Sequence, residues 1–337
     1  MFNDILKKVI AREDLSEAEA REVMDLIMEG NLTPAQIGGF LVAMRMKGER
    51  AEEIAGFALS MRARARKVDV AGYAIDTCGT GGDGGKTFNI STAAAFVAAA
   101  GGVKVAKHGN KAVSSISGSA DVLEALGARI DIEPEHAARC IKNVGLAFMF
   151  APLYHSAAKN AAAPRKELGV RTFFNVLGPL TNPASVQGQV IGVYDGMLTK
   201  TLAQVMLMLK ARKAMVVHGR DGLDEITTTR ETIVSEVKDG SVKNYILDPR
   251  DFGIPRAKPE DISGGDGIYN AGVIVDVLRG KKGPCHDIVV INSAAALYVG
   301  ERAEDLREGV EMAQSLIDSG AAYEKLQQFI RESRAAA

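Results

Sequence analysis

The first 70 residues carry only the hydrophobic periodicity of helices. Apolar positions recur every three or four residues in three segments, over 15–30, 32–48 and 50–68. Ser16 and Glu19 stand at the spacing of a capping box, as do Thr33 and Gln36 at the start of the second segment. We therefore expect a small all-helical domain over residues 1–72.

From Tyr73 onward the pattern changes to short apolar or β-branched runs, at 74–78, 103–109, 128–132, 146–151, 188–194, 213–219, 232–237 and 288–294. Helical segments lie between most of them, over 91–100, 121–126, 134–144 and 199–209. Strands that alternate with helices predict an α/β domain with a mostly parallel central sheet, here over residues 73–337. The stretch 232–247 instead predicts an antiparallel hairpin that turns at Asp239-Gly240.

The bulk composition narrows the class of protein. Of 337 residues, 47% are apolar and 25% are charged, and the net charge of −1 gives no support for an extended nucleic-acid surface. The three cysteines are far apart, which fits a reducing compartment and lacks the spacing of a metal site. The N-terminus does not read as a signal peptide, and no apolar run is long enough to span a bilayer. We expect a cytoplasmic protein.

Two loops carry the candidate chemistry. Residues 79–85 contain five glycines between a predicted strand and the helix near Ser91, where backbone N–H groups and a helix N-terminus can bind an anion. The glycine spacing matches neither a dinucleotide fingerprint nor a P-loop, and a plain glycine-rich turn would explain it equally well. A second loop changes this balance, because Lys107 and His108 end the next predicted strand before a run of hydroxyl residues. Together the loops predict a cradle for a phosphate ester.

Five longer blocks identify a family. The blocks are "GTGGDG" with "TFNIST" (79–92), "KHGN" (107–110), "SGSADVLEALG" (117–127), "APRKELGVRTFFNVLGPLTNPA" (163–184) and "VVHGRDGLDEITTT" (216–229). They closely resemble the anthranilate phosphoribosyltransferases, and the resemblance covers essentially the whole chain. It implies a nucleoside phosphorylase/phosphoribosyltransferase-like fold and the transfer of a phosphoribosyl group from 5-phosphoribosyl-1-pyrophosphate (PRPP) to anthranilate in tryptophan biosynthesis.

The resemblance also implies which residues bind the substrates. PRPP would be bound by Gly79, Thr80, Gly82, Asp83, Thr87, Asn89, Ile90, Ser91, Thr92, Lys107, His108, Gly109, Asn110, Lys111, Ala112, Val113, Ser114, Ser115 and Ser119. Anthranilate would be bound by Arg165, whose guanidinium suits a carboxylate, with Gly79 and Asn110 beside it and Tyr154 and His155 nearby. No catalytic residue is assigned with certainty, and His108 is a candidate acceptor for the proton of the amine.

Magnesium is the implied cofactor, with two ions in each active site. Ser91, Asp224 and Glu225 would be its ligands, because Mg²⁺ prefers a few carboxylates together with phosphate oxygens. Adjacent acids such as Asp224 and Glu225 are otherwise most often a solvated pair. The resemblance further implies a homodimer through the helical domain, which segments within 155–185 would join, and no membrane or nucleic-acid partner.

The chain departs from the usual family text at Lys111, Ile116, Ser156 and Ala158. Lys111 lies near the residues expected to bind phosphate, and Ser156 and Ala158 lie near the expected entry to the anthranilate site. Two alternatives stay open at this point: a class II nucleoside phosphorylase, which shares the fold, and a non-catalytic nucleic-acid-binding homologue. The blocks "KHGN" and "APRKELG" favour the transferase over the first, and the intact "GLDE" with the net charge disfavours the second.

Overall fold

The structure is a computed structural model, and it describes residues 1–81, 87–112 and 116–335. Its N-terminal part is a bundle of four helices, α1 (Phe2–Ile10), α2 (Glu17–Glu29), α3 (Pro34–Lys47) and α4 (Ala51–Arg64). Both expected capping boxes form: the Ser16 hydroxyl accepts from the Glu19 N–H, and the Thr33 hydroxyl accepts from the Gln36 N–H. No helix in these residues is long and apolar enough to cross a membrane.

A seven-stranded sheet forms the centre of the second part. Its order is β3-β2-β1-β4-β5-β6-β7, with strands β1 (Ile75–Gly79), β2 (Val105–Gly109), β3 (Leu146–Phe150), β4 (Gly188–Gly192), β5 (Lys213–Gly219), β6 (Thr232–Lys238) and β7 (Ser241–Leu247). The first five strands pair in parallel, and the last two form an antiparallel hairpin. Asp239 and Gly240 both have positive φ, 50° and 71°, as a two-residue hairpin turn requires. The expected fold class is confirmed.

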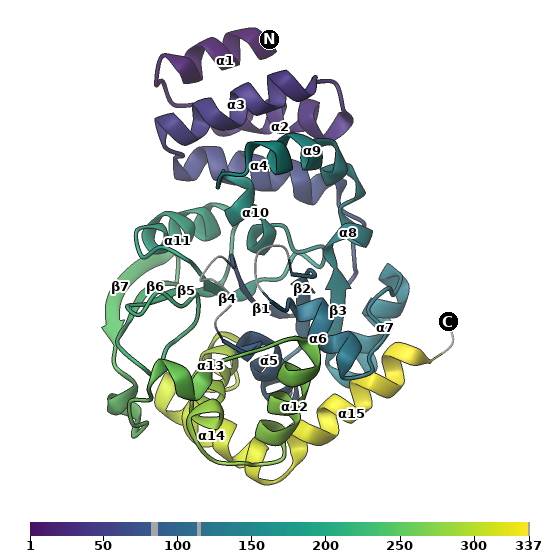
Figure 1. Cartoon of the computed structure of the whole chain (residues 1–337), viewed down its shortest axis with the longest axis vertical. Helices are drawn as coiled ribbons and strands as arrows, with labels where there is room; N and C mark the ends of the chain where they lie inside the picture. The colour runs from purple at the N-terminus through teal and green to yellow at the C-terminus, as the bar shows by residue number, and fades with distance from the viewer. Residues whose placement is uncertain (82–86, 113–115, 336–337) are drawn as a thin grey trace.

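Helices cover the sheet and lie around its ends, as Figure 1 shows. The bounds are α5 (Ile90–Ala100), α6 (Ser119–Ala125), α7 (Pro134–Val144), α8 (Ala151–Tyr154), α9 (Ala162–Leu168), α10 (Phe174–Leu180), α11 (Leu198–Met208), α12 (Gly267–Leu278), α13 (Pro284–Val299), α14 (Leu306–Asp318) and α15 (Ala321–Arg334), with 3₁₀ turns η1 (Ser156–Ala161), η2 (Pro249–Phe252) and η3 (Pro259–Ile262). Alternate β5 residues face opposite ways, so that Met215 and Val217 join the core with α5 and α13. Ala214 and Val216 join the core that contains α11 and the helical bundle.

Two of the expected strands are wrong. Residues 288–294 lie inside α13, of which 13 of 16 residues are buried. A helix buried on all sides loses the polar stripe that marks helical periodicity, so its apolar run looks like a core strand. Residues 128–132 form no strand; Ile130 and Ile132 are buried in different clusters of the core, and the Ile132 carbonyl accepts from the Tyr154 hydroxyl at 2.8 Å.

An aromatic stack connects the helical bundle to the segment that follows β3. Phe173 stacks on Phe57 of α4 at 4.2 Å and on Phe174 at 5.0 Å between ring centroids, and Phe40 of α3 meets Phe173 edge-on. All four rings belong to one buried cluster. The segment that carries α9 and α10 is thereby fixed against both α3 and α4, on the side of the bundle that faces the sheet in Figure 1.

Removing the Phe173 ring should therefore destabilise the junction. Phe173→Ala leaves a cavity between α4 and α10, and we expect it to lower the free energy of unfolding by about 3 kcal/mol. Val170→Ala is the control, because Val170 is 56% exposed and its truncation should change stability little. Urea unfolding followed by circular dichroism measures both, and equal stabilities of the two variants would contradict the prediction.

Candidate active site

The predicted binding residues gather at the carboxyl ends of β1, β2 and β4. The chain builds β1, β2 and β3 outward in one direction and then returns to place β4 on the other side of β1. This reversal creates a crevice outside the ends of neighbouring strands, which is where open α/β sheets bind ligands. Gly79 and Gly192 are paired there as the last residues of β1 and β4.

The loop between β5 and β6 folds over these two glycines. A Cβ atom at Gly192 would lie 1.5 Å from the Asp224 carbonyl oxygen, and one at Gly79 would lie 2.3 Å from Asp224 Oδ2. A side chain at Gly192 would displace the main chain of the loop, and one at Gly79 would displace the Asp224 carboxylate. The two glycines thus have a structural purpose that the sequence did not reveal: they let the acidic loop approach the sheet.

Each acid of this loop accepts a hydrogen bond from the glycine loop or the helix that follows it. The Gly81 N–H donates to Asp224 Oδ2 at 2.8 Å, and the Ser91 N–H donates to Glu225 Oε1 at 3.2 Å. Ser91 lies in the first turn of α5, where backbone N–H groups have no partner within the helix. The structure therefore places Glu225 at the start of α5 beside Ser91, and Asp224 next to it at the end of β1.

The oxygen atoms at this helix start suit magnesium. Two carboxylates and one hydroxyl are hard donors, and such a set suits Mg²⁺ when phosphate oxygens of a substrate complete its shell. No group of three or more acidic, histidine or cysteine side chains is placed to hold a metal ion anywhere in the described part of the chain, so a metal here would depend on the two carboxylates, the hydroxyl and the substrate. Glu225 and Ser91 also line a small cavity with Thr77, Cys78 and Asn292.

Lys107 is a buried cation at the end of β2. It is 3% exposed, its ammonium donates to the Thr77 carbonyl, and it lies 3.4 Å from the Ser91 hydroxyl oxygen. Lys107 is therefore not a solvated surface lysine. A buried positive charge directed at the start of α5 is well placed to attract a phosphate group.

Asp76 is the buried acid behind Lys107, and sequence reasoning did not single it out. It is fully buried, which raises the pKa of its carboxyl to about 6, while the Lys107 charge lowers that pKa in part. The Asn182 side chain donates to it at 2.8 Å, and the His108 N–H donates to it at 3.3 Å. Its signal in the sequence is an acid inside an otherwise apolar strand. Asp76 fixes the backbone that carries Lys107 and His108.

His108 and His155 face each other with ring centroids 5.1 Å apart. Burial lowers the pKa of His108 to about 3 and that of His155 to about 4, so both rings are neutral. His108 Nδ1 lies 3.2 Å from the Gly178 carbonyl oxygen, which can only accept, so Nδ1 carries the hydrogen. The Nε2 atoms of both rings are buried and have no partner among the residues that the structure describes. Tyr154 instead belongs to the core, with no exposed surface.

Arg165 lies in α9 with its guanidinium over the Phe174 ring, 4.7 Å from the centroid. Burial lowers the pKa of this guanidinium, yet it stays charged because its ordinary pKa is so high. Within the described ranges no carboxylate forms an ion pair with Arg165 or with Arg62, whose Nε donates to the Leu180 carbonyl at 2.6 Å. Arg165 is thus a partly buried cation held by an aromatic ring and available to an acidic ligand.

The remaining expected residues lie around the two loops or outside the described residues. Asn89 donates to the Ser117 carbonyl at 3.3 Å, which links the first phosphate loop to the second. Asp121, which sequence reasoning missed, shapes the second loop by accepting from the Ala112 and Gly118 N–H groups. Others line the same strand ends or helix starts, namely Thr80, Thr87, Ile90, Thr92, Gly109, Asn110 and Ser119. Outside the described residues lie Gly82, Asp83, Val113, Ser114 and Ser115.

All four departures from the family text lie at the surface or in a turn. Lys111 forms an exposed ion pair with Glu124 at 2.8 Å. Ile116 is 65% exposed, and Ser156 and Ala158 lie in the turn η1 directly after His155. None of the four replaces a residue that contacts the acidic pair.

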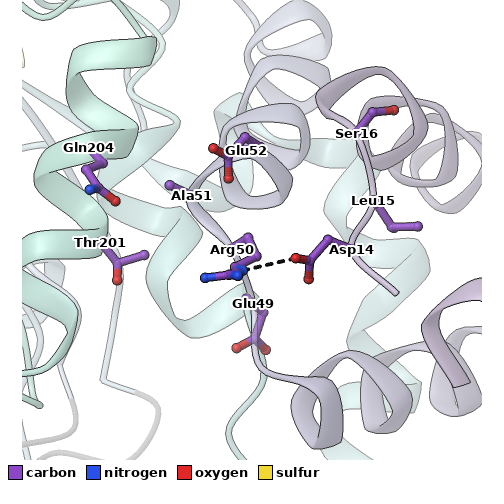
Figure 2. A pocket seen from close by; sticks show the side chains of 9 residues that line it. All are labelled: Asp14, Leu15, Ser16, Glu49, Arg50, Ala51, Glu52, Thr201 and Gln204. Carbon is purple, nitrogen blue, oxygen red and sulfur yellow. Dashed lines mark hydrogen bonds and ion pairs between the residues drawn. The ribbon is translucent and has the colours of Figure 1, made fainter. Parts of the chain in front are cut away.

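A larger pocket lies elsewhere, between the helical bundle and α11 (Figure 2). Its lining contains three acids, Asp14, Glu49 and Glu52, and one base, Arg50, which is already paired with Asp14 at 3.1 Å. An acidic lining repels a polyphosphate. The charge distribution therefore favours the crevice at the strand ends as the site for a phosphate ester.

Comparison with known proteins gives one consistent family. The helical bundle domain of the glycosyl transferase family matches residues 3–65, and the α/β domain of that family matches residues 71–323. The anthranilate phosphoribosyltransferase of Thermoanaerobacter sp. is 59% identical over 99% of both chains. That of Clostridium kluyveri is 57% identical over 98% of this chain and 99% of its own.

Solved structures agree with the sequence relatives. The anthranilate phosphoribosyltransferase of Thermus thermophilus is 43% identical and superposes with a TM-score of 0.93, over 98% of this chain and 99% of that one. The enzyme of Saccharomyces cerevisiae, solved in complex with PRPP and Mg, is 28% identical with a TM-score of 0.90, over 98% of this chain and 97% of that one. A further structure of the yeast enzyme contains 4-fluoroanthranilate.

The buried histidines predict how stability depends on pH. An unfolded histidine has a pKa near 6.5, whereas His155 titrates near 4 in the fold, so unfolding takes up a proton between these values. Stability therefore falls as the pH drops below about 6.5, by up to roughly 1 kcal/mol per pH unit for each such histidine.

Replacing His155 should remove its share of this slope. His155→Gln should lose nearly one proton of uptake on unfolding at pH 5, as measured by urea unfolding at several pH values. His218→Gln is a control for the loss of a histidine outside the pair, because the His218 ring contacts the Val193 carbonyl in another part of the sheet. An unchanged slope in His155→Gln would show that the ring is already protonated in the fold.

Proposed function

This chain belongs to the anthranilate phosphoribosyltransferase family, and we propose that the crevice at the ends of β1, β2 and β4 is its active site. The enzyme transfers the 5-phosphoribosyl group of PRPP to the amine of anthranilate, a step of tryptophan biosynthesis, and releases pyrophosphate. The observation that carries the assignment of the site is the convergence of Lys107, the acidic pair and the Ser91 N–H at the start of α5.

Pyrophosphate binds at the start of α5, beside the N–H groups of Gly81 and Ser91 that donate to the acidic pair. Those donors are held by carboxylates in the free protein, and phosphate oxygens are acceptors of the same kind. The buried ammonium of Lys107 supplies a fixed positive charge beside Ser91, at the same helix start. Thr80, Thr87 and Asn89 to Thr92 complete this end of the site, and residues 107–115 with Ser119 bind the ribose phosphate. Gly82, Asp83 and residues 113–115 enter this assignment from the family pattern alone.

Ser91, Asp224 and Glu225 would hold magnesium, and the family pattern places two ions in the site. When bound, Mg²⁺ neutralises charge on the pyrophosphate that departs. The chain itself contributes rigidity, because Asp224 and Glu225 lie on a loop pressed against Gly79 and Gly192. Donors fixed before the reaction stabilise the charge that develops in the transition state without reorganisation.

Anthranilate binds on the side of the helical bundle. Arg165 pairs with its carboxylate, and Asn110 and Gly79 border the ring. His108 and His155 close the aromatic site with two neutral rings, which desolvate the amine without adding a charge. The site therefore separates its tasks: the α/β domain holds the anionic donor substrate, and segment 155–182 with the bundle holds the aromatic acceptor.

The amine attacks C1 of the ribose as the bond from C1 to the pyrophosphate oxygen breaks, with inversion at C1. The new carbon–nitrogen bond leaves a proton on a secondary aryl ammonium, which is a strong acid. His108 Nε2 is the acceptor that we assign, because Nδ1 carries the hydrogen and leaves Nε2 with a free lone pair. A base with so low a pKa suffices for this proton, and most of the rate comes from positioning the two substrates.

The transfer itself is tested by the loss of anthranilate fluorescence on mixing the protein with anthranilate, PRPP and Mg²⁺. We expect a loss that requires both PRPP and Mg²⁺. Folded protein that leaves the fluorescence unchanged would contradict the function. Phosphate-dependent cleavage of thymidine or binding of single-stranded DNA by the same preparation would then identify which relative of the fold it is.

Arg165 should control the use of anthranilate alone. Arg165→Ala removes the carboxylate partner, and we expect KM for anthranilate to rise by about tenfold to a hundredfold, as the loss of a charge-assisted pair of 1.5–3 kcal/mol implies. KM for PRPP should change less than twofold. Arg165→Lys keeps the charge without the planar fork and should fall in between. An equal rise of both KM values would place Arg165 outside the aromatic site.

We also propose that the chain has two domains, a helical domain over residues 1–72 and an α/β domain over 73–337. In this proposal it is a cytoplasmic homodimer, and the two copies pair through their helical domains. Val42 and Met46 lie one turn apart on α3 and are 37% and 68% exposed, and Ile10 at the end of α1 is 66% exposed. Burial of such side chains by a second copy would remove apolar surface from water. All three cysteines are free, which fits a reducing compartment.

A charge on this surface should separate the copies. Met46→Glu is expected to shift the molar mass in solution from dimer to monomer, because an ion would be buried without a partner. Met197→Glu is the matched control, since Met197 is 82% exposed on the turn before α11. Light scattering after size exclusion measures both. A dimeric Met46→Glu variant or a monomeric wild type would contradict the proposed surface.

A further inference from the structure

Asn292 is an amide within a helix that is buried almost along its whole length. It lies in the middle of α13, is 3% exposed, and is flanked by Ile291 and Ser293, which are fully buried. A buried carboxamide is costly unless each of its polar atoms finds a partner. None of the family blocks described above includes this helix, so the residue has no role in the site as assigned so far.

The carboxamide of Asn292 is fully engaged by main-chain groups. Its Nδ2 donates to the Ile226 carbonyl at 2.8 Å, and its Oδ1 accepts from the Ile226 N–H at 3.0 Å. The second N–H of Nδ2 donates to the Ile288 carbonyl, one turn back in α13, at 2.8 Å. Asn292 thus pairs with both main-chain groups of Ile226, as a strand neighbour would, and is itself anchored to its own helix.

Ile226 is the residue directly after the acidic pair. The loop that carries Asp224 and Glu225 has no regular secondary structure between β5 and β6. On its outer side, Asp221 accepts from the Thr227 and Thr229 hydroxyls, which closes the loop on itself. The Gly81 and Ser91 N–H groups hold the two carboxylates, whereas the Asn292 pair holds the main chain beside them and fixes the loop to a helix buried against the sheet.

The anchor also lies close to the ligands. Asn292 lines the same small cavity as Glu225 and Ser91. A shift of Ile226 away from α13 would carry the Glu225 carboxylate away from the start of α5. Residues that hold metal ligands in this way typically change metal affinity or activity by 10- to 100-fold when they are replaced.

We propose that Asn292 is a positioning residue for the acidic pair: it fixes the main chain beside Glu225 and so sets the geometry in which Asp224 and Glu225 hold the magnesium pyrophosphate end of the substrate. This inference rests on the proposed function for the identity of that ligand. It extends the functional site to a helix that contributes no side chain to the crevice.

The test uses two variants and a control from the same helix. Asn292→Leu keeps the volume and removes all three hydrogen bonds, and Asn292→Ser keeps a polar atom too short to reach both groups of Ile226. Ser293→Ala is the matched control, because the Ser293 hydroxyl is equally buried and has no partner among the described residues. Having two variants matters if Asn292→Leu fails to fold.

Binding of inorganic pyrophosphate in the presence of Mg²⁺ is measured by titration calorimetry, which needs no turnover. We expect the folded Asn292 variants to bind at least about tenfold more weakly than wild type. In the transfer assay, KM for PRPP and the Mg²⁺ concentration for half-maximal rate should rise, with KM for anthranilate changed less than twofold. The control should match wild type in every measurement.

Failure of the positioning role and failure of the proposed function give different results. Wild-type binding of magnesium pyrophosphate by a folded Asn292 variant would overturn the positioning role, whatever the enzyme's activity. An equal loss for both substrates would also overturn it, because that pattern indicates a general loss of structure. A wild-type protein that binds magnesium pyrophosphate without transferring the phosphoribosyl group would contradict the proposed function and leave the binding comparison valid.

Discussion

The ends of β1 and β4 lie against the loop of Asp224 and Glu225, so closely that β4 could not end in a residue with a side chain and a side chain at the end of β1 would displace the Asp224 carboxylate. A Cβ at Gly192 would lie within bonding distance of the Asp224 carbonyl oxygen, at 1.5 Å. This close approach is the constraint on which the site depends. It presses two carboxylates against the Gly81 and Ser91 N–H groups and brings hard oxygen donors to the start of a helix. Without it, the acids would be a solvated pair at the surface.

The segment from Gly178 to Asn182 is fixed in a similar way, beside the two histidines. His108 contacts the Gly178 carbonyl, the Gln189 side chain donates to the Pro179 carbonyl, and Arg62 of α4 donates to the Leu180 carbonyl. Strand, helix and bundle thus all hold one short segment by its main chain. Because the bundle contributes one of these contacts, the geometry around the two histidines depends on how the bundle packs against the sheet.

The sequence indicated the class of fold because its local signals agree with the fold. Capping boxes, the Asp239-Gly240 turn and the alternation of strands with helices are all decided within a few residues. The buried helix α13 was mistaken for a strand over 288–294, since burial on all sides removes the periodicity that identifies a helix. The same helix carries Asn292, so the error also concealed its contact with Ile226.

The candidate site residues could be predicted from the sequence where they lie in the family motifs. Contacts between residues that are far apart in the chain could not be predicted in this way. Lys107 and His108 were predicted as binding residues from the sequence, but their burial and the buried acid beside them, Asp76, depend on how β1, β2 and Asn182 meet in space. The glycines at 79 and 192 are another example. Gly79 was predicted as a substrate-binding residue, whereas its neighbour in the structure is the Asp224 carboxylate, from a loop that lies far later in the chain.

The most direct measurement of the central claim is a crystal structure of the protein with Mn²⁺ and pyrophosphate, read by anomalous scattering from the manganese. The account predicts a metal peak at about 2.1–2.2 Å from a carboxylate oxygen of Asp224 or Glu225, with pyrophosphate at the start of α5 beside Lys107. A metal and pyrophosphate bound in the pocket between the helical bundle and α11, or an acidic pair that contacts neither, would contradict it.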